Sequence, residues 1–267
     1  MQQPELVDCQ LTVADNIATL MFARHDVRNA LTGTAIADDI VAVVNWVNSQ
    51  PSIAVLIITG EGSAFSAGGN IKDMADRVGD FAGDVETLEQ RYRQGIQRIP
   101  KALYRCEVPV IAAVNGPAIG AGFDIANMCD IRIASERAKF GETFINLGII
   151  PGDGGAWFMQ RLIGYQQAAH LTFSGKVIDA EKAKELGIVL SVVPDNSLQD
   201  EAEKLAKEMA DKPTHALRMS KRLMQIAQRT ELDDFLDICA AFQGICHNNP
   251  EHIEAVKGLM NKLAKSS

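Results

Sequence analysis

One stretch of this sequence, residues 108–140, constrains the fold most, because an apolar run leads directly into a glycine-rich turn. The five apolar residues Val110–Val114 predict a short strand that is buried on both faces. Three glycines follow between positions 116 and 122, and the periodicity of 123–128 then predicts a helix with Asp124 in its first turn. Free N–H groups at a helix start, next to a carboxylate, indicate a catalytic site. The pattern also fits a packing motif in which the aspartate complements the helix dipole.

A second glycine-rich loop repeats this arrangement earlier in the chain. The continuous apolar run 53–59 predicts another buried strand, and the loop 60–72 follows it and opens a helix. Such a loop is either a flexible connector or part of a site. Because parallel crossovers bring such turns to the same edge of a sheet, we expect two sets of backbone N–H groups to converge on one ligand. Neither loop matches the dinucleotide fingerprint Gly-x-Gly-x-x-Gly, and Gly-Lys-Ser/Thr is absent from the sequence.

Strands and helices alternate over the first two thirds of the chain, whereas every segment from Ser197 onward has a helical pattern. This change predicts an α/β core over 1–196 and a helical region over 197–267 that packs on a neighbour or a partner subunit. The other predicted elements are a hairpin with strands at 6–10 and 17–22, a helix with apolar positions from 36 to 47 capped by Thr32 or Thr34, a mobile loop at 76–86, a long helix at 85–105, and strands at 130–134, 138–140 and 188–193.

The composition of the 267 residues narrows the class of protein. A net charge of −8 argues against a surface for nucleic acid or an acidic membrane. The sequence contains neither an apolar run long enough to cross a bilayer nor a secretory signal. The five cysteines are scattered without C-x-x-C spacing, which favours a reduced, cytoplasmic protein, and no histidine pair has the spacing of metal ligands.

Several motifs together resemble those of the enoyl-CoA hydratase/isomerase (crotonase) family. They are Arg28-Asn29-Ala30-Leu31, Phe65-Ser66-Ala67-Gly68-Gly69-Asn70-Ile71-Lys72, 109–116, Gly120-Ala121-Gly122, 129–132 and Pro151-Gly152-Asp153-Gly154-Gly155. The resemblance covers almost the whole chain. It implies an α/β spiral of repeated β-β-α units, with a C-terminal all-α region that assembles a homotrimer or a hexamer made of two trimers. It also implies a coenzyme A thioester as substrate, without a separate cofactor.

The resemblance also implies roles for individual residues. The thioester oxygen would lie between the backbone N–H groups of Gly69 and Ala121, an oxyanion hole that stabilises the charge of an enolate. The residues implied to contact the coenzyme are Ala67, Gly68 and Ile71, through their backbones, and Arg28 or Lys72, through their charges. These two cations could equally be solvated surface charges.

The departures from the family pattern bear on the reaction. Hydratases of this family use two glutamates to hold and activate water; the first falls here on Asp124 and the second on Phe144, which cannot transfer a proton. Glu142 and Asp153 are the candidates for a second acid/base, although either could be a helix or turn cap. Other members shift double bonds with an aspartate in the following loop, one position earlier, where this chain has Gly152.

These residues predict an enzyme, a lyase or an isomerase, that stabilises a thioester enolate with Asp124 as acid/base. The reaction is hydration or double-bond isomerisation of an enoyl-CoA in fatty-acid or related acyl-CoA metabolism. Isomerisation is favoured, because an aromatic ring replaces the second carboxylate and moving a double bond needs only a base. The alternatives are decarboxylation or carbon–carbon hydrolysis through the same enolate, and a protein that binds acyl-CoA, or RNA, without turnover. The acidic balance argues against RNA, and the lack of Gly-x-Ser-x-Gly disfavours a serine hydrolase.

Overall fold

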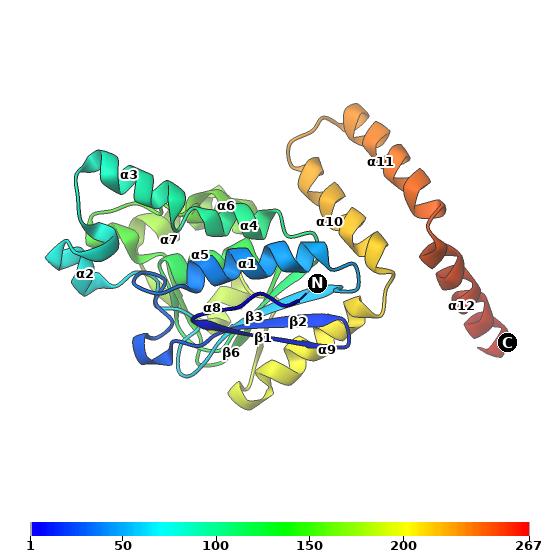
Figure 1. Cartoon of the computed structure of the whole chain (residues 1–267), viewed down its shortest axis with the longest axis horizontal. Coiled ribbons are helices and arrows are strands. Elements are labelled where there is room, and N and C mark those ends of the chain that lie inside the picture. Colours follow the sequence, from blue (N-terminus) through cyan, green and yellow to red (C-terminus); the bar gives the residue numbers. More distant parts are fainter. Residues whose placement is uncertain (1, 267) are drawn as a thin grey trace.

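The computed structural model describes residues 2–266, and the framework of this part of the chain is a six-stranded sheet with the order β1-β2-β3-β4-β6-β9 (Figure 1). Strands β1 and β2 form an antiparallel hairpin, and each later pair in this sheet is parallel. A smaller sheet has the order β5-β7-β8. The strands are β1 (Cys9–Ala14), β2 (Ile17–Phe22), β3 (Val55–Gly60), β4 (Val110–Val114), β5 (Ala118–Ile119), β6 (Ile131–Ser135), β7 (Lys139–Gly141), β8 (Val177–Asp179) and β9 (Ser191–Val193).

Helices cover both faces of the large sheet, which explains the continuous apolar runs. In β3, Leu56 and Ile58 pack into the cluster that contains α1, whereas Val55 and Ile57 pack into the cluster that contains α9. The helices are α1 (Ile36–Ser49), α2 (Ile71–Asp76), α3 (Val85–Gln94), α4 (Arg98–Tyr104), α5 (Ala121–Met128), α6 (Gly155–Ile163), α7 (Tyr165–Ser174), α8 (Ala180–Glu185), α9 (Leu198–Ala210), α10 (Thr214–Ala227), α11 (Leu232–His247) and α12 (Pro250–Ser266). None of the helices between residues 2 and 266 combines the length and the apolar character that a membrane span requires.

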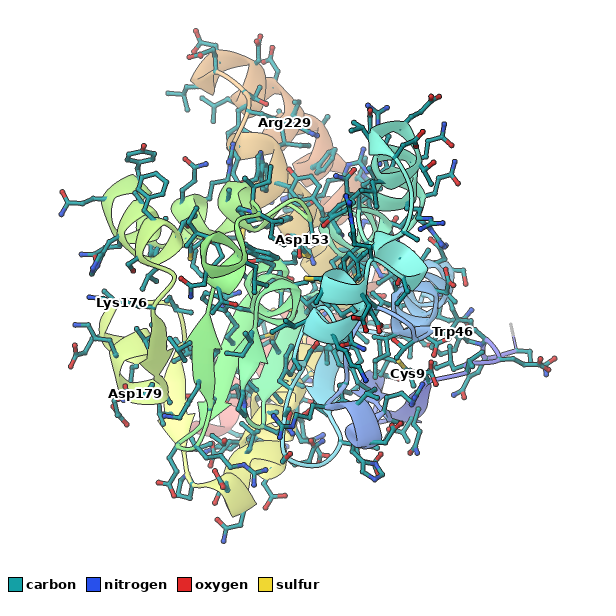
Figure 2. The ribbon with its side chains drawn as sticks, turned by 90° about the vertical axis from the view of Figure 1, so that its left-hand side faces the viewer. Cys9, Trp46, Asp153, Lys176, Asp179 and Arg229 are labelled. Carbon is teal, nitrogen blue, oxygen red and sulfur yellow. The ribbon has the colours of Figure 1, made fainter. Side chains whose placement is uncertain are left out.

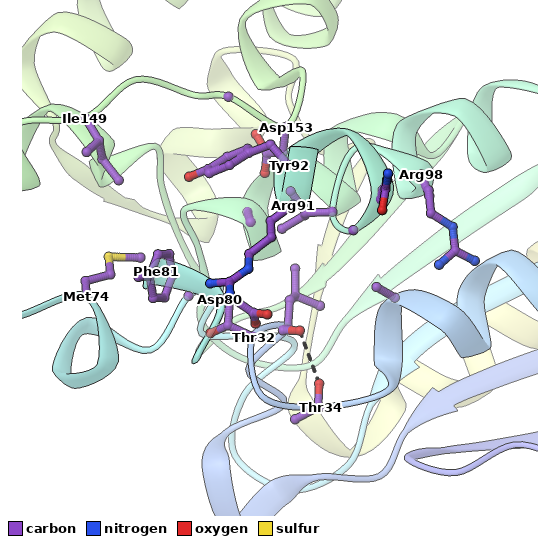
Figure 3. Close-up of a pocket in the computed structure, with 18 of the residues that line it drawn as sticks. Thr32, Thr34, Met74, Asp80, Phe81, Arg91, Tyr92, Arg98, Ile149 and Asp153 are labelled. Carbon is purple, nitrogen blue, oxygen red and sulfur yellow. Dashed lines mark hydrogen bonds between the residues drawn. The ribbon is translucent and has the colours of Figure 1, made fainter. Parts of the chain in front are cut away.

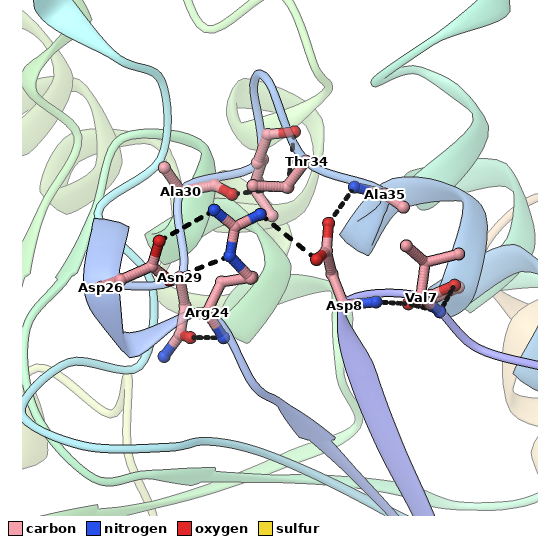
Figure 4. Close-up of polar contacts among 10 residues, drawn as sticks. Val7, Asp8, Arg24, Asp26, Asn29, Ala30, Thr34 and Ala35 are labelled. Carbon is pink, nitrogen blue, oxygen red and sulfur yellow. Dashed lines mark hydrogen bonds and ion pairs between the residues drawn. The ribbon is translucent and has the colours of Figure 1, made fainter.

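The predicted hairpin is present, but its first strand begins at Cys9 rather than Leu6. The backbone N–H groups of Val7 and Asp8 instead donate to the Asp39 carboxylate, so this segment runs outside the ladder. The predicted threonine cap of α1 is wrong. Asp8, from a distant segment, accepts a hydrogen bond from the Ala35 N–H at 2.6 Å, and Thr34 donates to the carbonyl of Ala30 instead (Figure 4). The same aspartate pairs with Arg24 at 3.2 Å, which ties the loop before α1 to the sheet (Figure 4).

The long helix predicted at 85–105 is two helices, α3 and α4. Gly95 has φ −103° and ψ −110°, a conformation that ends α3 and turns the chain into α4. The preceding segment 76–86 was predicted as a loop, and it contains a short 3-10 turn at Gly79–Phe81. Arg91 of α3 donates hydrogen bonds to the carbonyls of Gly79 and Ala82, so the turn is fastened to the helix that follows it.

The C-terminal helices differ in how they meet the sheet. Helix α9 packs its face of Leu198, Ala202 and Ala206 against the sheet. Helix α10 is anchored by Lys221, which donates to the Val108 carbonyl at 2.9 Å and pairs with Asp130 at 2.6 Å. Helices α11 and α12 extend away from the sheet (Figure 1). Their exposed apolar side chains are Leu232, Leu236, Ile245, Ile253, Val256, Leu259, Met260 and Leu263. The division at 196–197 and a role in assembly stay predictions.

Candidate active site

The two glycine-rich loops lie side by side, backbone against backbone. The Ile119 N–H donates to the Ser66 carbonyl at 3.0 Å, which joins the loop after β3 to the segment before α5. Gly68 has φ +74°, and a Cβ atom there would approach the Ile119 carbonyl and the Ala121 nitrogen. A Cβ atom on Gly122 would overlap the Ser66 carbonyl. Glycine at these two positions therefore permits the convergence that the sequence predicts.

Two backbone N–H groups at this junction are free. Gly69 and Ala121 line the same cavity of about 230 Å³, and within residues 2–266 neither backbone nitrogen donates a hydrogen bond. Ala121 is the first residue of α5, so its N–H belongs to the positive end of the helix dipole. The cavity thus offers two donors to an oxygen atom that gains negative charge.

Apolar side chains line part of this cavity, and Figure 3 labels Met74, Phe81 and Ile149 among them. The larger apolar side chains are Leu31, Met74, Phe81, Ile96, Phe144 and Ile149, and Tyr92 adds a phenol ring. At the rim, Asp80 accepts a hydrogen bond from the Gly33 N–H at 3.1 Å, and Asp38 pairs with Arg98. Both rim aspartates are exposed.

Three carboxyl groups are buried beneath this surface: Asp124 is 0% exposed, Glu142 1% and Asp153 4%. Of these three, Asp153 alone lines the cavity, and Figure 2 shows it in the middle of the molecule, where the green and the cyan segments meet. Asp124 lies behind it on α5. The sequence predicts the leading role for Asp124, whereas Asp153 is the carboxyl that lines the cavity.

Asp124 and Asp153 act on each other electrostatically. The pKa of Asp124 is raised well above its ordinary value, first by burial and then by the negative charge of Asp153 and its hydrogen bonding. Burial also raises the pKa of Asp153, while hydrogen bonds from Asp124 and from backbone N–H groups oppose that rise. Within residues 2–266, no hydrogen bond of standard geometry satisfies any of the four carboxyl oxygens of this pair. Two adjacent buried carboxyls without other partners favour a state in which they share one proton.

Glu142 lies close enough to influence this pair without reaching the cavity. Its carboxylate accepts a hydrogen bond from the Thr172 hydroxyl. Burial raises the pKa of Glu142 to about 7, the Thr172 hydrogen bond opposes that rise, and the Asp153 charge adds to it. The structure therefore brings Glu142 to the site as a buried neighbour of Asp153.

Phe144 occupies the cavity wall beside Gly120. A Cβ atom on Gly120 would lie 3.7 Å from the Phe144 ring, so the ring covers the turn that leads into α5. An aromatic ring there offers neither a proton nor a hydrogen bond to a water molecule. The wall position that the resemblance gives to a second glutamate is thus apolar in this protein.

A second groove joins the cavity at Gly69 and gathers most of the residues expected to contact the coenzyme. Arg28, Ala67, Ile71 and Lys72 line it together, whereas Gly68 is buried beneath. Within residues 2–266 neither Arg28 nor Lys72 has a salt-bridge partner. Two cations without carboxylate partners at one groove are suited to phosphate groups.

Sequence reasoning missed Tyr92, Met74 and Phe81. Phe81 comes from the segment predicted as a mobile loop, Tyr92 from the predicted long helix and Met74 from the helix predicted to follow the loop 60–72, and the local pattern around them is mostly polar. The available signal was Asp84, which caps α3 by accepting a hydrogen bond from the Thr87 N–H at 2.9 Å.

Comparisons with known proteins agree with this geometry. The family model described as enoyl-CoA hydratase/isomerase matches residues 12–263. The chain is 34% identical to crotonyl-CoA hydratase of Syntrophomonas wolfei over 250 residues, which are 93% of either chain. It is 35% identical over 216 residues, 81% of either chain, to 1,2-epoxyphenylacetyl-CoA isomerase of Escherichia coli. The crystal structure of an enoyl-CoA hydratase from Bacillus anthracis superposes with a TM-score of 0.88 at 28% identity, covering 96% of this chain and 97% of the other.

These findings confirm the predicted family and the predicted fold class, because the matches span nearly the whole chain and include its helical C-terminal region. The chain belongs to the enoyl-CoA hydratase/isomerase family, and its fold is that of crotonase.

Proposed function

We propose that this protein binds an acyl-CoA thioester, stabilises its enolate, and isomerises the double bond of an enoyl-CoA with Asp153 as the acid/base. One observation carries the proposal: the N–H groups of Gly69 and Ala121 and the carboxyl of Asp153 belong to the walls of one cavity. The two donors would act on the thioester oxygen, whose negative charge grows in the transition state. Such donors contribute on the order of 3 kcal/mol each to catalysis. The named hydratases and the named isomerase among the relatives support this class of reaction.

The proton transfer follows from the asymmetry of the aspartate pair. Asp153 as carboxylate removes a proton from C2 of a 3-enoyl thioester. The electrons of that C–H bond form a C1=C2 double bond while the carbonyl π electrons move onto the thioester oxygen, which gives a dienolate. The protonated Asp153 then returns a proton to C4, and a 2-enoyl thioester results. Burial and then the charge of Asp153 raise the pKa of Asp124, so Asp124 keeps the shared proton and Asp153 is the ionised partner. Asp124 is thereby a positioning residue for Asp153.

Hydration of an enoyl-CoA is the second candidate. Relatives named crotonyl-CoA hydratase and short-chain-enoyl-CoA hydratase favour it. The Phe144 ring argues against it, because no second carboxylate lies at that wall to hold the attacking water.

The remaining parts of the proposal concern binding and assembly. Arg28 and Lys72 would meet the coenzyme phosphates in the groove that opens at Gly69, with no cofactor beyond the coenzyme of the substrate itself. The exposed apolar side chains of α11 and α12 support assembly into a trimer or a hexamer through the helical region. The five scattered, free cysteines support a cytoplasmic location.

The direct test incubates the purified protein with a 3-enoyl-CoA and, separately, with crotonyl-CoA in heavy water. Mass spectrometry follows deuterium, and absorbance follows the conjugated double bond. The proposal expects double-bond migration with deuterium uptake from the 3-enoyl-CoA. Addition of water to crotonyl-CoA without migration would replace it with the hydratase candidate. Binding of both thioesters without turnover would refute both.

A further inference from the structure

Tyr92, on α3, places a phenol next to the loop that carries Asp153. A Cβ atom on Gly152 would lie 3.0 Å from Cε1 of Tyr92, so the ring fills the space in which a side chain at position 152 would project. Both Tyr92 and Asp153 line the cavity, and the close-up shows the ring beside the Asp153 carboxyl (Figure 3). The phenol therefore belongs to the same wall as the proposed base.

The Tyr92 hydroxyl is available to a ligand. No side-chain hydrogen bond of Tyr92 occurs within residues 2–266, and both Asp153 carboxyl oxygens lack a hydrogen-bond partner. Figure 3 shows the hydroxyl pointing away from α3, toward the side of the cavity that contains Ile149. Burial and the Asp153 charge raise the pKa of Tyr92, which keeps the hydroxyl protonated and makes it a donor.

Four of the other side chains that line the cavity are apolar, and one threonine hydroxyl already donates its proton. Leu31, Phe81, Phe144 and Ile149 have no hydrogen-bonding side chains, and the Thr34 hydroxyl already donates to the Ala30 carbonyl at 2.7 Å. A hydroxyl group held between Tyr92 and Asp153 would accept a hydrogen bond from the phenol and donate one to the carboxylate.

We propose that Tyr92 and Asp153 together bind a hydroxyl group next to the acyl chain, so that Tyr92 determines specificity for an oxygen-bearing reactant. This inference rests on the proposed function, because it places the acyl chain in the cavity below Gly69 and Ala121. The hydroxyl has two possible sources, an acyl chain that already carries one or a water molecule that adds to the double bond. Either source presents the same acceptor and donor to the two side chains.

The test compares the wild-type protein with Tyr92→Phe, which keeps the ring against Gly152 and removes only the hydroxyl. Tyr165→Phe is the matched control, because Tyr165 is 71% exposed and lies outside the cavity. Calorimetry measures the Kd of butyryl-CoA, 3-hydroxybutyryl-CoA and 4-hydroxybutyryl-CoA. If the acyl chain supplies the hydroxyl, Tyr92→Phe weakens binding of one hydroxylated ligand about five- to tenfold and leaves butyryl-CoA unchanged.

Kinetics identify the other source. If water supplies the hydroxyl, Tyr92→Phe lowers crotonyl-CoA hydration about tenfold and leaves the Kd values and 3-enoyl-CoA isomerisation unchanged. The proposal is overturned if Tyr92→Phe shifts the Kd of all three ligands by one common factor. It is also overturned if every Kd stays constant and the variant changes the rates of hydration and isomerisation equally, or changes neither rate. If the wild-type protein binds these ligands but does not turn over 3-enoyl-CoA, the isomerase proposal is contradicted. The role of Tyr92 is still tested in that case, because the Kd comparison needs no turnover.

Discussion

The backbone of Gly155, the first residue of α6, lies directly against the carboxyl group of Asp124 on α5. A Cβ atom at position 155 would overlap that carboxyl. Because α5 and α6 pack on one another at this point, the smallest residue is what allows a buried carboxyl to lie between them. The Asp124–Asp153 pair therefore depends on a residue that carries no chemistry of its own.

The first prediction follows from this contact. Gly155→Ala should displace the Asp124 carboxyl, lower isomerisation by at least about tenfold, and destabilise the fold by about 1–3 kcal/mol. Gly244→Ala is the control, because that glycine lies within α11 with nothing within 4 Å of an added Cβ atom. The control should keep full activity and gain up to about 1 kcal/mol. A turnover assay measures activity and urea unfolding measures stability. Equal activity of the two variants would show that the contact between Gly155 and Asp124 does not matter for catalysis.

The second prediction concerns pH and stability. The folded-state pKa of Glu142 is about 7, above its ordinary value of 4.5, so the folded protein binds more protons than the unfolded chain between these values. The free energy of unfolding should therefore decrease as the pH rises from about 4.5 through 7. The raised pKa values of Asp124 and Asp153 act in the same direction.

Glu142→Gln isolates this contribution, because the amide oxygen still accepts the Thr172 hydrogen bond. Urea unfolding at about pH 5 and about pH 8 should show a smaller loss of stability in the variant, by about 2 kcal/mol. Identical pH dependence in the two proteins would mean that Glu142 is ionised normally in the fold.

The third prediction concerns the coenzyme groove. Arg28→Ala and Lys72→Ala should each raise the Kd of coenzyme A about three- to tenfold, with a smaller effect at high salt, because both cations lie at the exposed groove. Lys176→Ala removes a charge outside that groove and is the control. Calorimetry at two salt concentrations measures the effect. If all three variants weaken binding alike, the effect comes from net charge and the groove is not the coenzyme site.

The fourth prediction concerns the attachment of α10. Arg218 donates to the carbonyls of Gln50 at 2.7 Å and Ile53 at 3.1 Å, and it pairs with Glu107 at 2.8 Å. Arg218→Ala leaves those carbonyls without this donor and should lower the free energy of unfolding by about 2–3 kcal/mol. Arg222→Ala, one turn later on the same helix, is the control and should cost less than about 0.5 kcal/mol. Similar losses in urea unfolding would mean that α10 is attached by its apolar contacts alone.

Much of the fold was predictable from the sequence because it depends on local patterns. The runs at 53–59 and 110–114 are apolar on both faces, and the structure buries both strands between layers of helices. The convergence of the two glycine-rich loops was predictable for the same reason, since parallel strands deliver both turns to one edge. The break in the predicted helix at Gly95 was not foreseen, because its neighbours are good helix formers.

The site was less predictable, because it depends on contacts between distant segments. Asp8 rather than a threonine caps α1 across 27 positions of sequence. Spacing alone could not show that Asp153 reaches the cavity and Asp124 lies behind it, since that order is set by how α6 packs on α5. Tyr92 comes from a helix whose sequence is mostly polar, and only the fold brings it against Gly152.

In the proposed mechanism Asp153, and not Asp124, exchanges the proton with the substrate. The most direct measurement is the rate of deuterium uptake from heavy water into a 3-enoyl-CoA by Asp153→Asn, Asp124→Asn and the rim control Asp38→Asn. We expect a loss of about 10²–10⁴-fold for Asp153→Asn, a smaller loss for Asp124→Asn, whose amide can donate to Asp153, and wild-type exchange for the control. Full exchange by Asp153→Asn, with exchange abolished in Asp124→Asn, would contradict this mechanism.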